Sequence, residues 1–415
     1  MLEQFFHSRS RIRALRGCSD GTLLDGFAQA LWEVGYAEYT ARKRILAASH
    51  LLCWAGAKGI PSDELDMRML ARFDDHLKRC KCKGFTHTDR ADWLCAARSF
   101  LGYRCGNGVA PWRTSALENV LPALLQQFFA WMREQRGTGP STLNSYRAPL
   151  RALLKRIGED PGKLDAPILR RFILEQSQRM GAGSAKNCAS AVRMFLRFLI
   201  TQGLCRSGLD AAVPVLAHWR LAPLPRYLQS DEVERVIASC IPSSPIGRRN
   251  RAIVLLLARL GLRAGDVVRL RLGDINWKDA SISVSGKSRR ETRLPLSQEV
   301  GQAIVDYLQH GRPHAQSDAL FLRSVAPFTA FRSPANVGLI VKDAIARAGV
   351  ACPRGGAAHV LRHSVATAML RQGASLQDIA ALLRHRSVET TQICAKVDVT
   401  ALDRIAQPWP EVRPC

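Results

Sequence analysis

The 415-residue sequence predicts a mainly α-helical protein with a small β component. Apolar residues recur at three- and four-residue steps through the N-terminal half, which is the periodicity of amphipathic helices. A segment between Leu216 and Ser230 contains two prolines and suits an extended linker, and one pair of period-two strands interrupts the helical patterns beyond it. We therefore predict two N-terminal helical domains, 1–115 and 116–222, and a C-terminal α+β domain, 223–415.

The two N-terminal domains are predicted to be copies of one helical module. Residues 40–56 align with residues 142–158, and both segments carry a Leu-Leu pair at the same position and end on glycine. Three further pairs match in the same order: Leu65-Asp66 with Leu164-Asp165, Arg72-Phe73 with Arg171-Phe172, and Arg98-x-Phe100-Leu101 with Arg193-x-Phe195-Leu196. A tandem repeat is the simplest account of these matches. In the second copy, Ser141 and Thr142 are predicted to cap a helix.

The charge balance favours a polyanionic partner. Sixty Lys and Arg residues against 35 Asp and Glu residues give a formal net charge of +25, and the basic residues are spread through helical segments. Neutralising phosphates releases condensed counterions, so a nucleic acid is the expected partner. The candidate DNA-binding residues of the second domain are Arg147, Arg151, Lys155, Lys186, Arg193 and Arg197.

Neither a membrane span nor a metal site is predicted. The longest apolar run, residues 252–258, is far shorter than the roughly 20 residues that a span needs. The first residues lack the apolar stretch of a signal peptide, so we expect a cytoplasmic, nucleoid-associated location. A zinc site can be drawn from nearby side chains, but their gaps match no common ligand spacing. These side chains are Cys80, Cys82, His87, Cys95 and Cys105.

Two motifs of the C-terminal domain carry candidate catalytic residues. Residues 250–277 read as a buried apolar helix, a turn through Gly261, and then Arg263 with Asp266 three residues later. In residues 281–296, period-two segments flank a Gly-Lys turn that contains Lys287, which predicts a β-hairpin.

A third motif follows at residues 359–398. His359 and Arg362 share a predicted helix, His385 ends the next helix, and Cys394 lies nine residues after His385. In order and spacing, these residues and those of the two preceding motifs resemble the tyrosine recombinase, or phage integrase, family. In that family the residue at the position of Cys394 is the tyrosine that attacks DNA. No tyrosine follows Tyr307 in this chain.

The resemblance implies roles for the remaining residues. Arg263 and Arg362 would hold the scissile phosphate, and Asp266 would help to hold the site together. Lys287 would act as a general acid for the leaving oxygen, His359 would assist proton transfer, and His385 would hydrogen-bond a phosphate oxygen. Arg384 and Arg386 stand where the family often has a glycine and a small residue, and they are expected to add charge near the phosphate.

The resemblance also implies the fold, reaction and partners. We expect SAM-like DNA-binding domains before a tyrosine-recombinase catalytic domain. The expected partner is double-stranded DNA, bound by a homo- or hetero-oligomer. On DNA this oligomer would be a synaptic tetramer, with partner recombinases where it is a hetero-oligomer. Strands would be broken through a covalent 3′-phosphoprotein link and rejoined without a cofactor or metal. An origin in a mobile element is expected, with a role in DNA integration or transposition.

Three interpretations of Cys394 stay open at this point. The thiol could itself be the nucleophile, although it is shorter than a tyrosine and sulfur is a poor match for phosphorus in a diester. The protein could bind and synapse DNA without cutting it, alone as an accessory or regulatory protein or beside an active partner that supplies a tyrosine. A tyrosine could also have been replaced, leaving a recombinase with impaired or absent cleavage. A type IB topoisomerase, which shares this chemistry, is the alternative enzyme class.

Overall fold

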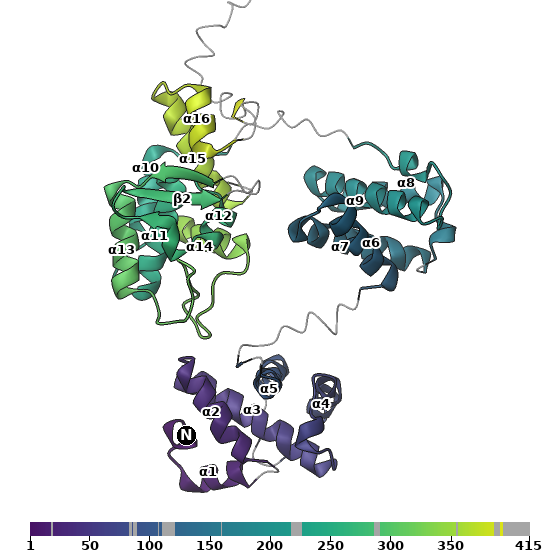
Figure 1. Cartoon of the computed structure of the whole chain (residues 1–415), viewed down its shortest axis with the longest axis vertical. Helices are drawn as coiled ribbons and strands as arrows, with labels where there is room; N and C mark the ends of the chain where they lie inside the picture. Colours follow the sequence, from purple (N-terminus) through teal and green to yellow (C-terminus); the bar gives the residue numbers. More distant parts are fainter. Residues whose placement is uncertain are drawn as a thin grey trace, which may run out of the picture. The chain divides into compact units, whose positions relative to one another are not determined.

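The computed structural model describes residues 1–17, 20–82, 85, 89–106, 108–109, 121–158, 160–216, 226–285, 291–353, 356–385 and 391–392. Within these ranges, large clusters of buried apolar residues form in 2–109, in 125–213 and in 228–361. We name these parts the first module, the second module and the C-terminal domain (Figure 1). The predicted domain boundaries, at 115–116 and 222–223, lie outside the described residues.

The first module is helical throughout its described residues. Its 3-10 helices are η1 (Leu2–Gln4) and η2 (Ser62–Glu64), and its α-helices are α1 (Arg9–Arg16), α2 (Thr22–Glu33), α3 (Glu38–Ala57), α4 (Met69–Leu77) and α5 (Arg90–Arg104). Helix α3 packs against α2 and α5, and α5 also packs against α4. The module core therefore forms around the long helix α3.

The second module repeats this order of helices. It contains α6 (Ala123–Arg136), α7 (Pro140–Ile157), η4 (Pro161–Lys163), α8 (Ala166–Arg179), α9 (Ala182–Thr201) and η5 (Leu209–Ala212). The aligned Leu-Leu pairs lie on α3 and α7, and both pairs are buried in the cores of their own modules. The aligned Phe-Leu pairs on α5 and α9 are buried too. Equivalent positions thus have equivalent roles in packing.

Helix α7 begins earlier than its sequence predicts. Ser141 and Thr142 lie inside the helix, which starts at Pro140 after Gly139 and has no side-chain cap. Proline suits this first position because its fixed φ is helical and it has no N–H that would lack a partner. The prediction of a hydroxyl cap at Ser141-Thr142 was therefore wrong.

The C-terminal domain combines helices with a small sheet. Its helices are α10 (Ser230–Ala238), α11 (Pro245–Leu260), α12 (Ala264–Arg269), η6 (Leu272–Asp274), α13 (Gln298–His310), α14 (Pro334–Arg347), α15 (Ala357–Arg371) and α16 (Leu376–Leu383). Residues 252–257 of α11 are completely buried, and α11 packs against α13 and α15. Six successive buried apolar residues occupy all sides of a helix, so this part of α11 lies inside the core and the predicted buried helix is confirmed.

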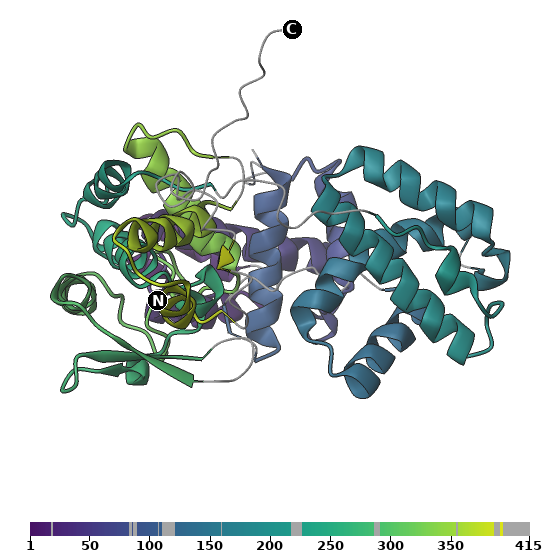
Figure 2. The same cartoon turned by 90° about the horizontal axis from the view of Figure 1, so that it is seen from above.

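The sheet has the predicted hairpin. Strands β1 (Ile275–Asn276), β2 (Ser281–Ser285) and β3 (Glu291–Pro295) form an antiparallel sheet in the order β1-β2-β3. Strands of this sheet are drawn as green arrows in Figure 2. Ile282 pairs with Leu294, and the three side chains of Ile282, Val284 and Leu294 are buried. The Gly-Lys turn, with Lys287, lies outside the described residues. A mainly helical fold with a small sheet is confirmed, and none of the described helices has the length and apolar character to cross a membrane.

Candidate active site

Arg263 is held at the junction of α11 and α12. Helix α11 ends at Gly261, whose φ of 56° is in the left-handed region that glycine adopts without strain. A Cβ atom on Gly261 would also lie 2.5 Å from Leu383 Cδ2. Leu262 is buried, and Arg263 is the residue that precedes the first turn of α12. The tight turn therefore fixes the backbone from which the Arg263 side chain extends.

Asp266 is the buried acidic centre of this region. Its carboxylate is 2% exposed and accepts a hydrogen bond from the backbone N–H of Arg263 at 3.3 Å. Arg269 Nη2 donates to Oδ1 at 2.6 Å, and Arg384 Nη2 donates to Oδ2 at 2.6 Å. Charge-assisted hydrogen bonds of this kind compensate the cost of burying a carboxylate. Asp266 thus joins the start of α12 to the end of α16.

Arg362 joins three helices from inside the domain. Its side chain lies on α15, is almost completely buried, and donates hydrogen bonds to the carbonyl oxygens of Gly261 and Leu383. These two carbonyls belong to the last turns of α11 and α16. A planar guanidinium with several fixed donors suits such a junction. The position of Arg362 therefore depends on the same turn that positions Arg263.

Three histidines gather around the two arginines. His359 and His363 lie one turn apart on α15, with ring centroids 6.3 Å apart. His385 follows the end of α16, and its Nδ1 is 2.8 Å from Thr391 Oγ1. The backbone N–H of His385 donates a hydrogen bond to the carbonyl oxygen of Ala380 at 2.9 Å, which fixes the backbone from which the imidazole extends.

The pKa values of the three histidines are lowered, first by desolvation and then by neighbouring residues. Desolvation, followed by the charges of Arg362 and Arg263, lowers the pKa of His359 and lowers the pKa of His385 to about 4. Desolvation and the neighbouring His359 and Arg362 lower the pKa of His363. All three imidazoles are therefore neutral at pH 7 in the absence of an anion.

Arg384 does not have the role that was expected from its sequence position. Its side chain is 9% exposed and turned onto Asp266, so it stabilises the domain core and does not add an open charge beside a phosphate. Its φ of 54° explains why a glycine would suit this position. Arg386 lies outside the described residues.

Four of the predicted catalytic residues, Arg263, His359, Arg362 and His385, come together in this region of the C-terminal domain. Arg263 donates to the carbonyl oxygen of Arg384 at 3.1 Å, next to His385, and the electrostatic interactions of the two arginines reach His359 and His385. Two guanidinium groups beside neutral imidazoles can bind an oxyanion and exchange a proton with it. Lys287 and Cys394 lie outside the described residues.

The candidate DNA-binding residues of the second module divide into two groups. Arg151 and Lys155 on α7 and Lys186 on α9 are exposed, and Arg147 on α7 is half-buried. Two others, on α9, bind the segment that follows this helix. Arg193 donates a hydrogen bond to the carbonyl oxygen of Val213 at 3.1 Å, and Arg197 forms an ion pair with Asp210 at 3.0 Å. Lys155 and Lys186 thus expose their charges on α7 and α9, whereas Arg193 and Arg197 also contribute to the fold.

One cluster was missed in the sequence. Cys80 and Cys82 do not approach Cys95 or Cys105 as metal ligands, and His87 lies outside the described residues. Their Sγ atoms lie instead beside the imidazoles of His50 and His76. The available signal was His76-x-x-x-Cys80-x-Cys82 at the end of a helix, but His50 is too distant in sequence to be recognised as its fourth member.

Comparison with known proteins identifies the family. Residues 226–400 match the phage integrase family, and residues 125–203 match its N-terminal SAM-like domain. The chain is 36% identical to the "Putative integrase/recombinase y4rA" of Sinorhizobium fredii, over 92% of this chain and 93% of that protein. This chain belongs to the phage integrase family. It is also 31% identical to the tyrosine recombinase XerD of Caulobacter vibrioides, over 68% of this chain and 93% of XerD.

Solved structures of recombinases share the fold of this phage integrase family member. The XerH site-specific recombinase bound to palindromic difH substrate has a TM-score of 0.53 at 17% identity, covering 81% of this chain and 93% of XerH. A lambda integrase dimer bound to a COC′ core site has a TM-score of 0.51 at 17% identity, covering 71% and 99%. The prediction of a SAM-like helical domain before a tyrosine-recombinase catalytic domain is confirmed, and the family is one of enzymes.

Proposed function

We propose that this chain is a site-specific DNA recombinase encoded by a mobile element, whose DNA cleavage is impaired or absent because Cys394 stands in place of a tyrosine. The observation that supports it best is that Arg263, His359, Arg362 and His385, from three separate segments, lie close enough together to interact. A scissile phosphate is the ligand that this set of side chains would suit.

The proposed chemistry assigns each residue a role in phosphoryl transfer. During in-line attack the non-bridging oxygens gather charge, which Arg263 and Arg362 would stabilise by hydrogen bonds. His385 would hydrogen-bond one of these oxygens, and His359 would assist proton transfer at the nucleophile. The phosphorus forms a bond to the attacking atom as the bond to the 5′ oxygen breaks, and Lys287 would protonate that oxygen. A 5′-hydroxyl then reverses the reaction on the partner strand.

Cys394 is the residue on which the proposed loss of cleavage rests. Its thiol would reach less far than a tyrosine hydroxyl, and sulfur is a weak nucleophile toward a phosphodiester. Neutral histidines and two arginines would still bind the phosphate. The chain is therefore proposed to bind and synapse DNA, as a homo-oligomer or beside a partner recombinase that supplies a tyrosine.

The proposed DNA partner is supported by charge. The net charge of +25 and the exposed Arg151, Lys155 and Lys186 of the second module would neutralise backbone phosphates. This module would hold one side of the duplex while the C-terminal domain binds the scissile phosphate. We propose the same domain boundaries as the sequence predicts, 115–116 and 222–223, and a cytoplasmic, nucleoid-associated location.

A nicked substrate tests the proposal. Duplexes bound by the purified chain are first selected from a random pool, and the selected site is then synthesised with a nick that prevents religation. The chain as given, Cys394→Tyr and Cys394→Ala are incubated with it and separated under denaturing conditions. We expect a covalent protein-DNA product with Cys394→Tyr alone. Trapping by the unchanged chain but not by Cys394→Ala would assign the nucleophile to the cysteine.

A non-cleaving DNA-binding protein derived from a recombinase is the second candidate, and Cys394 favours it. Under this alternative the chain selects a specific duplex, but Cys394→Tyr forms no covalent product because other parts of the site have also changed. The control is Arg263→Ala in the Cys394→Tyr background, which is expected to remove any trapping. Failure to select any duplex would contradict both candidates.

A further inference from the structure

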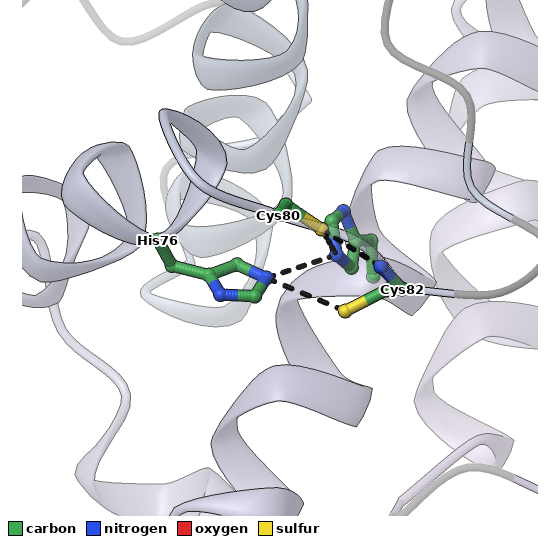
Figure 3. Close-up of side chains that lie close together, drawn as sticks. His76, Cys80 and Cys82 are labelled. Carbon is green, nitrogen blue, oxygen red and sulfur yellow. Dashed lines mark hydrogen bonds between the residues drawn. The ribbon is translucent and has the colours of Figure 1, made fainter.

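Four side chains with metal-binding atoms converge inside the first module. His50 lies in the middle of α3 and is completely buried, and His76 lies in the last turn of α4. Cys80 and Cys82 follow α4 and return their side chains toward it (Figure 3). The four ligand atoms, two imidazole nitrogens and two sulfurs, all lie within 4.8 Å of one another.

Three of the distances between these atoms are close to those of a tetrahedral metal site. Bonds of about 2.0–2.1 Å to nitrogen and about 2.3 Å to sulfur put tetrahedral ligands about 3.4 Å apart for two nitrogens and about 3.6 Å for nitrogen and sulfur. His76 Nε2 is 3.2 Å from His50 Nε2. Cys80 Sγ is 3.4 Å from His50 Nε2, and Cys82 Sγ is 3.6 Å from His76 Nε2. One ion at the centre could bind all four atoms with little rearrangement.

Aromatic rings enclose the cluster. The Phe85 ring stacks on the His50 imidazole at 4.3 Å between centroids, with an interplanar angle of 12°. Phe73 and Trp93 contact the same imidazole edge-on, at 5.4 Å and 5.6 Å. Trp54 lies 6.0 Å from the His76 ring. An apolar enclosure limits access of water and strengthens bonds between a cation and its ligands.

We propose that His50, His76, Cys80 and Cys82 bind one zinc ion as a closed structural site. Two sulfur and two imidazole ligands in tetrahedral arrangement are the set that zinc prefers, and four protein ligands leave no position for a substrate. Two thiolates would balance the charge of the ion, so the partly buried site would be neutral overall. The ion would attach the segment after α4 to the middle of α3.

Comparison of the two modules supports a specific role for these side chains. By the alignment of residues 40–56 with 142–158, His50 corresponds to Ala152, and by the Leu65–Leu164 match His76 corresponds to Glu175. Glu175 forms an ion pair with Arg156 on α7. The second module therefore forms equivalent helices without a histidine at either position. The His and Cys residues of the first module are not needed for the helical fold as such.

Metal analysis of the full chain tests the site. The protein is produced without a histidine tag, and its metal content is measured by mass spectrometry before and after dialysis. We expect about one zinc per chain, and a severalfold lower content in the variant with both Cys80→Ser and Cys82→Ser. The matched control carries Cys95→Ser and Cys105→Ser, two thiols of the same module outside the cluster, and is expected to keep its zinc.

Cobalt spectroscopy keeps the test independent of whether the variants fold. The unchanged chain is freed of metal with a chelator and titrated with Co²⁺. We expect intense visible bands of tetrahedral cobalt and near-ultraviolet bands of thiolate-to-cobalt charge transfer, both lost on addition of zinc. Absence of zinc from the purified chain, together with a cobalt spectrum that lacks thiolate bands, would overturn the proposal. Retention of zinc by a folded Cys80→Ser, Cys82→Ser variant would overturn it as well.

Discussion

The Arg384 guanidinium donates a 2.6 Å hydrogen bond to Asp266 across 118 residues of sequence. Both side chains are nearly inaccessible to solvent, at 9% and 2% exposure. The pair connects the end of α16, which precedes His385, to the first turn of α12, which follows Arg263. The spacing between Arg263 and His385 therefore depends on a buried ion pair that neither of them forms.

Replacing Asp266 should destabilise the C-terminal domain. Asp266→Asn leaves the buried Arg384 without a carboxylate and weakens the hydrogen bonds to Arg269 and to the Arg263 backbone. Removing one partner of a buried ion pair costs about 3–5 kcal/mol, and we expect the free energy of unfolding in urea to fall by about 3 kcal/mol. The control is Asp318→Asn, whose exposed pair with Arg271 should contribute less than about 1 kcal/mol. Equal effects of the two substitutions would contradict the role given to Asp266.

The backbone at Arg384 should be strained independently of its side chain. Its φ of 54° costs an ordinary residue about 1 kcal/mol more than glycine. Arg384→Gly and Arg384→Ala both lose the bond to Asp266, so their difference isolates the backbone effect. We expect Arg384→Gly to be the more stable of the two by about 1 kcal/mol in urea unfolding, and both to be less stable than the unchanged chain. Equal stability of both variants would show that the residue does not retain this conformation.

Patterns that depend on neighbours in sequence were the ones that predicted structure correctly. The alternation of Ile282 and Val284 located the buried face of a hairpin, because successive strand residues point to opposite sides. The apolar run of residues 252–257 located the central helix for the same kind of reason. Arg263, His359, Arg362 and His385 could be placed relative to their helices, since each lies within or next to such a pattern.

Contacts between residues that are far apart in the sequence could not be predicted from such local patterns. Arg384 was expected to face a phosphate, because nothing near it in sequence indicates that Asp266 lies within reach. Cys80 and Cys82 were compared with residues that follow them, whereas their neighbours in space, His50 and His76, precede them. Tertiary packing of α3 against the segment after α4 decides this grouping, and one sequence does not reveal it.

Low pH should destabilise the C-terminal domain through its histidines. The pKa of His385 is lowered to about 4, whereas an unfolded chain has the ordinary value of about 6.5. Between these values the unfolded state binds more protons, so stability present above pH 6.5 is lost as the pH falls toward 4. His359 and His363 act in the same direction.

Urea unfolding at pH 7 and at pH 5 measures this effect, and His385→Gln should reduce the difference between the two conditions. Nuclear magnetic resonance titration of the His385 ring proton assigns the change to this residue. A His385 pKa near 6.5 in the folded chain would contradict the prediction, as would an unchanged pH dependence in the variant.

Salt dependence of DNA affinity should separate the exposed basic residues of the second module from those that hold its fold. Lys155 and Lys186 are exposed on α7 and α9, so replacing either with alanine should remove about one phosphate contact and reduce the slope of log affinity against log salt by about 0.9. Arg197→Ala should instead lower the stability of the module by less than about 1 kcal/mol, because its pair with Asp210 is partly exposed.

Lys163→Ala, on η4, is the charge-matched control and should leave the slope unchanged. The slope is measured by fluorescence anisotropy on the selected duplex at several salt concentrations. If Lys163→Ala changes it as much as Lys186→Ala does, the module binds DNA through its overall charge and not through α7 and α9.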